Sequence, residues 1–81
     1  MDGHAKILRD PVLRHLATYR PEDPGPTLGD IRDAIDRFED NAALLEALLS
    51  LQRDGLIGRS GYAPWRWRLT EAGGEQVRRL P

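Results

Sequence analysis

Apolar residues recur at helical intervals along most of this chain, and they alternate with polar residues in one short part of it. The helical spacing predicts four helices, at about residues 11–20, 28–38, 41–54 and 70–80. The alternating part predicts two short strands, 56–60 and 65–69, joined by a turn around Gly61 and Pro64. The expected fold class is therefore mainly α-helical with one small β-hairpin.

The first helix is predicted to begin at Asp10 and Pro11, because aspartate can cap a helix and proline suits the first helical position. Ile7 and Leu8 lie just before it, either as an extra helical turn or as an arm packed on the body. We expect residues 1–6 to form a flexible arm and residues 1–81 to form a single domain.

Local signals also predict the ends of the later helices. Thr27, followed three residues later by Asp30, is typical of a capping box at the start of the second helix. Asp40 or Asn41 is the expected cap of the third helix, and Gly55 can adopt the left-handed conformation that ends it. The residues of these two helices expected in the core include Ile31, Phe38, Leu44, Leu48 and Leu51.

Composition restricts the environment of the protein. The 81 residues include no cysteine, and no apolar run approaches the roughly 18 residues that a membrane-spanning helix requires. The first six residues lack the apolar centre of a signal peptide. We therefore expect a cytoplasmic protein with no disulfide, no thiolate metal site and no membrane partner.

The net charge of −1 is unevenly distributed along the chain. Residues 22–54 carry nine acidic side chains against three arginines, a net charge of −6. Residues 55–81 carry five arginines against two glutamates, a net charge of +3, and residues 1–21 carry +2. Because nucleic-acid-binding modules are typically basic overall, this pattern fits either basic ends that contact a partner or a solvated surface of mixed charge.

Two sequence runs, LLSLQRDGLI at residues 48–57 and WRLTEAG at 67–73, resemble winged helix-turn-helix bacterial regulators of the MarR and PadR groups. The resemblance covers about residues 7–80. It implies that the third helix lies in the major groove of double-stranded DNA, that the hairpin (the wing) contacts the backbone or minor groove, and that the segment around Thr27 adds a short third strand. Such regulators dimerise through long terminal helices. Residues 1–81 contain none, so a homodimer would need another surface.

The candidate DNA contacts fall into two groups. On the third helix they are Asn41, Glu46, Ser50 and Arg53. Only Arg53 is basic, so this helix is expected to read few base edges, although a glutamate can accept a hydrogen bond from cytosine. On the hairpin they are Arg59, Tyr62, Arg66 and Arg68. Arginine suits both phosphate contact and a narrow minor groove, so the hairpin is the stronger candidate.

A protein partner remains the alternative. Leu45, Leu49 and Trp65 are candidates for an apolar contact surface with another protein or with a second copy of the chain, whereas Trp67 is expected to lie in the core. An exposed patch containing both leucines would favour this alternative. A continuous positive strip of hairpin arginines beside the third helix would favour DNA.

No catalytic constellation is visible in the sequence. His4 and His15 lack a matching set of metal ligands, and no serine has a plausible base near it. We therefore expect no cofactor, no metal and no enzymatic activity. The primary hypothesis is a small DNA-binding transcriptional regulator, and the alternative is a winged-helix protein-interaction module that does not bind DNA.

Overall fold

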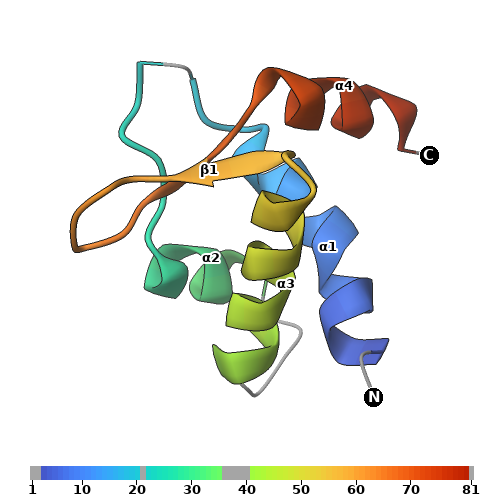
Figure 1. Ribbon diagram of the computed structural model, residues 1–81, viewed down its shortest axis with the longest axis horizontal. Helices are drawn as coiled ribbons and strands as arrows, with labels where there is room; N and C mark the ends of the chain where they lie inside the picture. Colours follow the sequence, from blue (N-terminus) through green and yellow to red (C-terminus); the bar gives the residue numbers. More distant parts are fainter. Residues whose placement is uncertain (1–2, 21, 36–40, 81) are drawn as a thin grey trace.

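The computed structural model describes residues 3–20, 22–35 and 41–80, with side chains from Ile7 onward. The elements, in chain order, are α1 Gly3–Leu16, α2 Leu28–Ile35, α3 Asn41–Arg53, β1 Ile57–Arg59, β2 Trp67–Leu69 and α4 Glu71–Arg79. Figure 1 shows α1 and α2 on either side of α3. α4 lies across the end of the molecule where α3 leads into β1. The expected fold class, mainly helical with one small hairpin, is confirmed.

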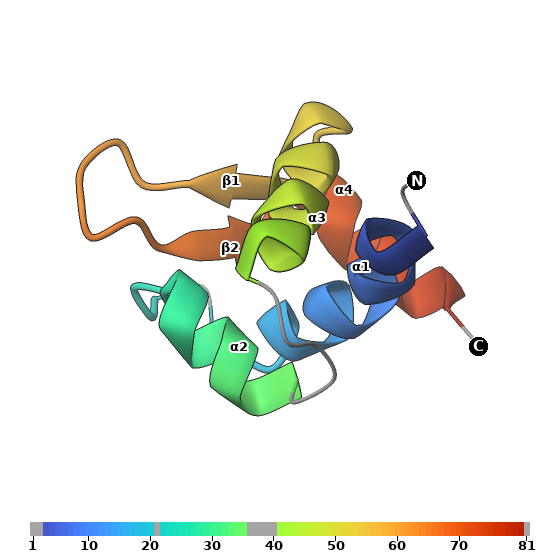
Figure 2. The same ribbon diagram turned by 90° about the horizontal axis from the view of Figure 1, so that it is seen from below.

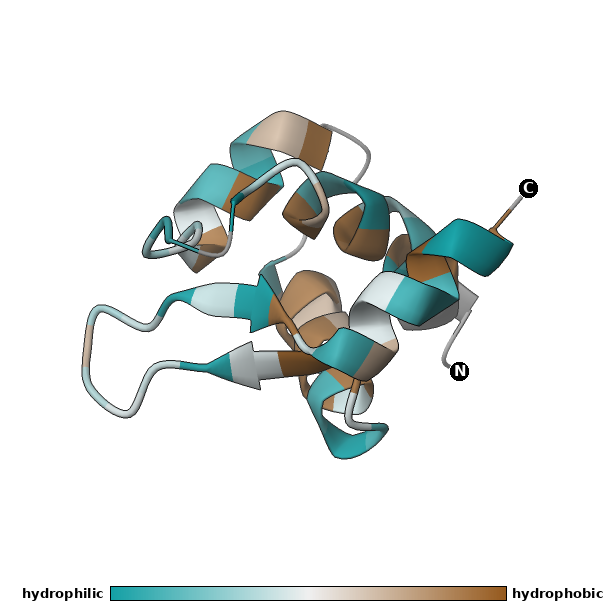
Figure 3. Ribbon diagram, turned by 90° about the horizontal axis from the view of Figure 1, so that it is seen from above, coloured by the Kyte–Doolittle hydropathy of each residue, from teal (hydrophilic) through white to brown (hydrophobic). Residues whose placement is uncertain are grey.

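One apolar cluster connects α1, α2, α3 and the hairpin. Its buried members are Val12, Leu13, Leu16, Ile31, Leu44, Leu48, Leu51, Ile57 and Trp67. Figure 3 shows such apolar residues recurring among hydrophilic ones along the helices. Of the apolar residues predicted to face inward from α2 and α3, Ile31, Leu44, Leu48 and Leu51 are buried, Leu28 and Ile35 are half-buried, and Ala34 is exposed. Phe38, the end of the second helix beyond residue 35, and Asp40 lie outside them.

The boundaries predicted for the first helix were wrong at both ends. α1 includes residues 3–6, which were expected to form an arm, and Pro11 lies inside it. Proline removes one helical hydrogen bond, but Leu8 of the earlier turns is buried against Ala47 of α3. This tertiary burial stabilises helix on the N-terminal side of Pro11. The helix then ends at Leu16 because the next residues form tighter turns, such as Thr18 N–H to His15 O at 3.0 Å.

The capping box predicted at the start of α2 is present. The Thr27 N–H donates to Asp30 Oδ2 at 3.1 Å, and the Asp30 N–H donates to Thr27 Oγ1 at 3.3 Å. The bond from the Thr27 N–H lowers the pKa of Asp30 below its usual 3.8, and the Thr27 side chain and the positive charge of Arg66 lower it further. The ionised carboxylate is therefore the form that stabilises this helix start.

Replacing Asp30 with asparagine should remove a pH-dependent part of the stability. Because the folded pKa of Asp30 is lowered, its contribution is complete above the unfolded value of 3.8 and is lost as pH falls through the folded pKa. Asparagine keeps an oxygen acceptor but carries no charge. We expect Asp30→Asn to melt below wild type at neutral pH and the two melting temperatures to converge as pH falls through the folded pKa of Asp30. A gap that stays constant over this range would contradict the assignment.

Gly55 ends α3 before the hairpin, as the sequence predicted. Gly55 has φ +80°, and the Leu56 N–H donates to Leu51 O while the Gly55 N–H donates to Gln52 O, both at 3.0 Å. The strands are shorter than predicted. They pair antiparallel with Ile57 opposite Leu69 and Arg59 opposite Trp67.

The loop before α2 packs against the outer edge of β2. The Trp67 N–H donates to Pro26 O at 3.0 Å, and Thr27 forms an isolated antiparallel bridge with Arg66. The third strand implied by the family resemblance is therefore a single bridge. Gly25 has φ +90°, and a Cβ at this position would lie 2.3 Å from Trp67 O. The close approach of loop and strand thus requires glycine.

Candidate functional site

The outward face of α3 is narrower than the sequence predicted. Glu46, Leu49 and Arg53 are exposed on it. Asn41 is also exposed, but it is the first residue of α3 rather than its cap, and its Oδ1 accepts from Arg32 Nη1 of α2 at 3.3 Å. Ala42 is exposed as well, so the face presents one acidic, two apolar and one basic side chain.

Ser50 lies on the side of α3 that faces α1. Its hydroxyl accepts from Arg9 Nη1 at 2.6 Å, and Arg9 Nη2 forms an ion pair with Asp54 at 2.7 Å. The half-buried Ser50 is thus bonded within the chain rather than displayed with Arg53. The helix predicted to begin at Pro11 left Arg9 outside regular structure, so sequence reasoning missed this contact.

Leu45 and Leu49 do not form a joint exposed patch. Leu45 is half-buried and packs against the core cluster, whereas Leu49 is 42% exposed. Trp65 is 45% exposed, but it lies on the hairpin. The three candidates for a protein interface therefore lie in different environments.

Two hairpin arginines hold the loop before α2. Arg66 Nη1 donates to Gly25 O at 2.7 Å, and Arg68 Nη2 donates to Asp23 O. Arg66 is half-buried and Arg68 is exposed. Each guanidinium has five N–H donors, so these bonds leave most donors of both side chains available.

Arg59 lies on the opposite face of the hairpin from Arg66 and Arg68, and its guanidinium stacks on the indole ring of Trp65. Its guanidinium carbon lies 4.0 Å from the centroid of the Trp65 ring and 6.0 Å from that of Trp67. Such cation–π contact holds the flat face of the guanidinium and leaves its N–H edges free for oxygen acceptors. The half-exposed Trp65 therefore orders Arg59 on the face of the hairpin that carries Trp67, opposite to Arg66 and Arg68.

These side chains surround one groove, here called the hairpin groove, with a volume of about 440 Å³. Its lining residues are Pro24, Gly58, Arg59, Ser60, Tyr62, Pro64, Arg66 and Arg68. All four hairpin residues predicted as DNA contacts line it, and Tyr62 is 78% exposed. The contribution of Gly58 was missed from the sequence, although a glycine within a short strand is a recognised signal of close backbone approach.

Figure 2 shows how the hairpin relates to α3. The two lie along one edge of the molecule, with β1 next to α3 and the loop between the strands extending beyond the helices. The N-terminal part of α1 and the end of α4 lie at the other side. The hairpin and α3 are therefore neighbours in space, and residues of α3 and β1 are in contact.

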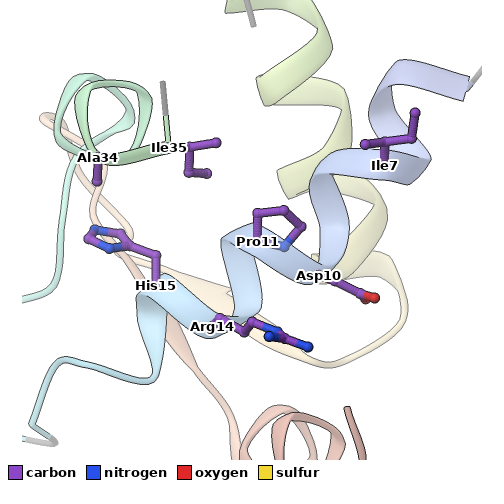
Figure 4. A pocket seen from close by; sticks show the side chains of 7 residues that line it. All are labelled: Ile7, Asp10, Pro11, Arg14, His15, Ala34 and Ile35. Carbon is purple, nitrogen blue, oxygen red and sulfur yellow. The ribbon is translucent and has the colours of Figure 1, made fainter. Parts of the chain in front are cut away.

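A second hollow lies between α1 and α2. Its lining residues are Ile7, Asp10, Pro11, Arg14, His15, Ala34 and Ile35. Figure 4 shows Pro11 and His15 on the side of α1 toward α2, with Asp10 and Arg14 extending the other way. None of the site residues predicted from the sequence lines it. Among the side chains described, in residues 7–20, 22–35 and 41–80, no group of three or more histidine or carboxylate side chains is placed to hold a metal ion.

Comparisons of the chain with protein-family models, with curated proteins and with solved structures gave no match. In the part of the chain that the structure describes, no helix is long and apolar enough to cross a membrane. The function is therefore inferred from the chemistry of the hairpin groove and of α3.

Proposed function

We propose that this chain is a winged helix-turn-helix module that binds double-stranded DNA and acts as a transcriptional regulator. The order of elements supports this proposal, since α2 and α3 are followed by an antiparallel hairpin beside α3 and then by α4. In this arrangement α3 is the helix for the major groove and the hairpin is the wing.

The observation that carries the proposal is the set of three arginines around the hairpin groove. Within the described part of the chain, none of the three forms an ion pair with a carboxylate. Their positive charge is therefore available to phosphates, which supply much of the affinity of DNA-binding proteins.

The face of α3 determines what kind of binding is proposed. Phosphate contacts position a protein on DNA, whereas base contacts specify the sequence. Arg53 is the single basic residue among the exposed Glu46, Leu49 and Arg53, so α3 offers few donors to base edges. The proposed module therefore draws its affinity mainly from the hairpin and discriminates weakly between DNA sequences.

The test is a fluorescence-anisotropy titration of a mixed-sequence duplex over a range of salt concentrations. Removing two phosphate contacts with the double variant Arg59→Gln/Arg68→Gln should reduce the slope of log affinity against log salt by about two units, at ~0.9 per contact. Arg66 is left intact because it is half-buried and bonded to Gly25 O. Circular dichroism checks that the variant remains folded.

The matched control is Arg78→Gln/Arg79→Gln, which removes the same charge from the exposed last turn of α4. Neither arginine lines the hairpin groove, so the salt slope should stay within about half a unit of wild type. Equal slopes for the two double variants would remove the hairpin from the DNA-binding surface.

A protein-interaction module is the second candidate, and the exposure of Leu49 favours it. A leucine on the outward face of α3 does not help to bind polar base edges but can pack against another protein. If no duplex binding is found at low salt and sedimentation shows self-association that Leu49→Glu abolishes, this second candidate replaces the first.

A further inference from the structure

A third hollow, here called the α4 hollow, lies between the end of α1, the loop before α2, β2 and α4. Its volume is about 580 Å³, and its apolar lining includes the buried Leu16 and the half-buried Leu69 and Val77. Sites for small molecules typically combine a volume of this order with an apolar lining and a few polar groups. The α4 hollow can therefore hold a small molecule that has an apolar part.

Gly74 keeps the α4 side of this hollow open. Glu71, Gly74, Val77 and Arg78 all line the hollow, and their spacing places them on one face of α4. A Cβ on Gly74 would meet no atom within 4 Å, whereas a Cβ on the adjacent Gly73 would collide with Leu56 O. Glycine inside a helix is destabilising relative to alanine, so no contact within the described chain accounts for glycine at position 74.

Charges of both signs line the α4 hollow without neutralising one another. Arg68 and Arg78 are exposed, and neither forms an ion pair with another described residue, whereas Arg20 already has such a pair. Arg68 Nη2 donates to the backbone O of Asp23, so this guanidinium lies beside a residue of opposite charge. The Asp23 carboxylate accepts the Arg20 N–H at 3.0 Å and retains further acceptor positions. Glu71 adds a second carboxylate to the lining.

We propose that the α4 hollow binds a large apolar amino acid in its zwitterionic form. The α-carboxylate pairs with Arg68 and the α-ammonium group with the neighbouring Asp23, since the two ligand groups are carried by one carbon atom and need adjacent partners of opposite charge. The apolar side chain extends along α4 over Gly74 and Val77, where its burial adds affinity.

Arg68 connects this site to the hairpin, because it lines both the α4 hollow and the hairpin groove. A carboxylate bound to Arg68 removes its charge from the groove that is proposed to contact the DNA backbone. This consequence rests on the proposed function, whereas binding of the amino acid does not. A saturating amino acid should weaken duplex binding by roughly fivefold, a typical size for coupling between two sites.

The first test compares three ligands that share one ring and one chain length. L-phenylalanine, L-phenylalaninamide, which lacks the carboxylate, and 3-phenylpropionate, which lacks the ammonium group, are titrated into the wild-type protein with amide shifts in NMR spectra as the readout. We expect phenylalanine to shift the amides of Arg68, Leu69 and Gly74, and the other two ligands to bind roughly tenfold more weakly or less, because each loses one charge-assisted pair.

The ligand series can contradict the proposal in two ways. If phenylalanine does not bind, or its shifts centre away from the α4 hollow, the site is overturned. If 3-phenylpropionate or phenylalaninamide binds as tightly as phenylalanine, the assignment of a zwitterion is overturned.

The decisive variant is Gly74→Leu, which fills the hollow and leaves every charge in place. Leucine favours helices, and no atom lies within 4 Å of the new Cβ, so the variant should fold, as circular dichroism can check. It should bind phenylalanine roughly tenfold more weakly or less. The matched control Ala72→Leu adds the same side chain to α4 at an exposed position that does not line the hollow, and it should bind as wild type does.

Equal phenylalanine affinities for Gly74→Leu and Ala72→Leu would overturn the site. Should Gly74→Leu not fold, the position of the wild-type shifts and the comparison of the three ligands still decide the matter.

Anisotropy titrations of a mixed-sequence duplex, with and without saturating phenylalanine, separate this inference from the proposed function. Duplex binding that phenylalanine weakens in wild type but not in Gly74→Leu supports the coupling through Arg68. Duplex binding that phenylalanine leaves unchanged overturns the coupling and retains the function. Phenylalanine binding to a wild-type protein that binds no duplex overturns the function and retains the amino-acid site.

Discussion

Replacing Gly73 with alanine is expected to lower the free energy of unfolding by about 3 kcal/mol. A Cβ at Gly73 would lie 1.9 Å from Leu56 O and 3.0 Å from Leu69 Cδ2. The Leu56 carbonyl cannot easily move, because it accepts the Thr70 N–H at 3.0 Å at the start of α4. Alanine would therefore force α4 away from the hairpin and break this bond. Urea denaturation followed by circular dichroism measures the loss.

The neighbouring Gly74 is the control for this prediction. It lies in the same helix, and a Cβ there would meet nothing within 4 Å. Gly74→Ala should therefore raise the unfolding free energy by about 0.5–1 kcal/mol, since alanine favours the helix and restricts the unfolded chain. If Gly73→Ala is also neutral or stabilising, α4 does not pack on Leu56 as described.

Replacing Trp67 with alanine is expected to cost about 3–5 kcal/mol of the unfolding free energy. Trp67 is 1% exposed and is the largest side chain in the core cluster. A domain of this size has a total stability of roughly 4–12 kcal/mol, so the variant should be largely unfolded or close to unfolding. Thermal unfolding by circular dichroism provides the measurement.

Trp67→Phe separates packing from hydrogen bonding at this position. In the described part of the chain, the buried Trp67 Nε1 has no hydrogen-bond acceptor. Phenylalanine removes this unpaired N–H while keeping an aromatic ring, so we expect a smaller loss of about 1–2 kcal/mol. A loss as large as that of Trp67→Ala would contradict this account. The backbone bond from the Trp67 N–H to Pro26 O is common to both variants.

Local signals in the sequence predicted the elements that depend on local physics. The Thr27–Asp30 capping box, the left-handed Gly55 and the alternation around Trp67 each act within a few residues, and each has the predicted geometry. The start of α1 could not be predicted in this way. It depends on burial of Leu8 against Ala47, which lies far away in the chain.

The candidate site was predictable in its residue types but not in its arrangement. Strand alternation correctly placed Arg66 and Arg68 on one face of the hairpin, away from the buried Trp67. Their bonds to the loop before α2 and the contact of Arg9 with Ser50 join residues 41 or more positions apart, so no local pattern reports them. Periodicity likewise placed Ser50 on the outer face of α3, because it cannot locate α1.

The sequence by itself determined which residues form helices and strands and which of their faces are apolar, since hydrophobic periodicity and capping act over one or two turns. Gly55 was predictable from its place after a helix, but only the tertiary structure decided the roles of Gly73 and Gly74. Gly73 and Gly74 are adjacent and look alike in sequence, yet a carbonyl of the hairpin lies against the first and open space lies beside the second. Gly58 lines the hairpin groove because strand pairing places it opposite Arg68, and the loop before α2 brings Pro24 to the same groove.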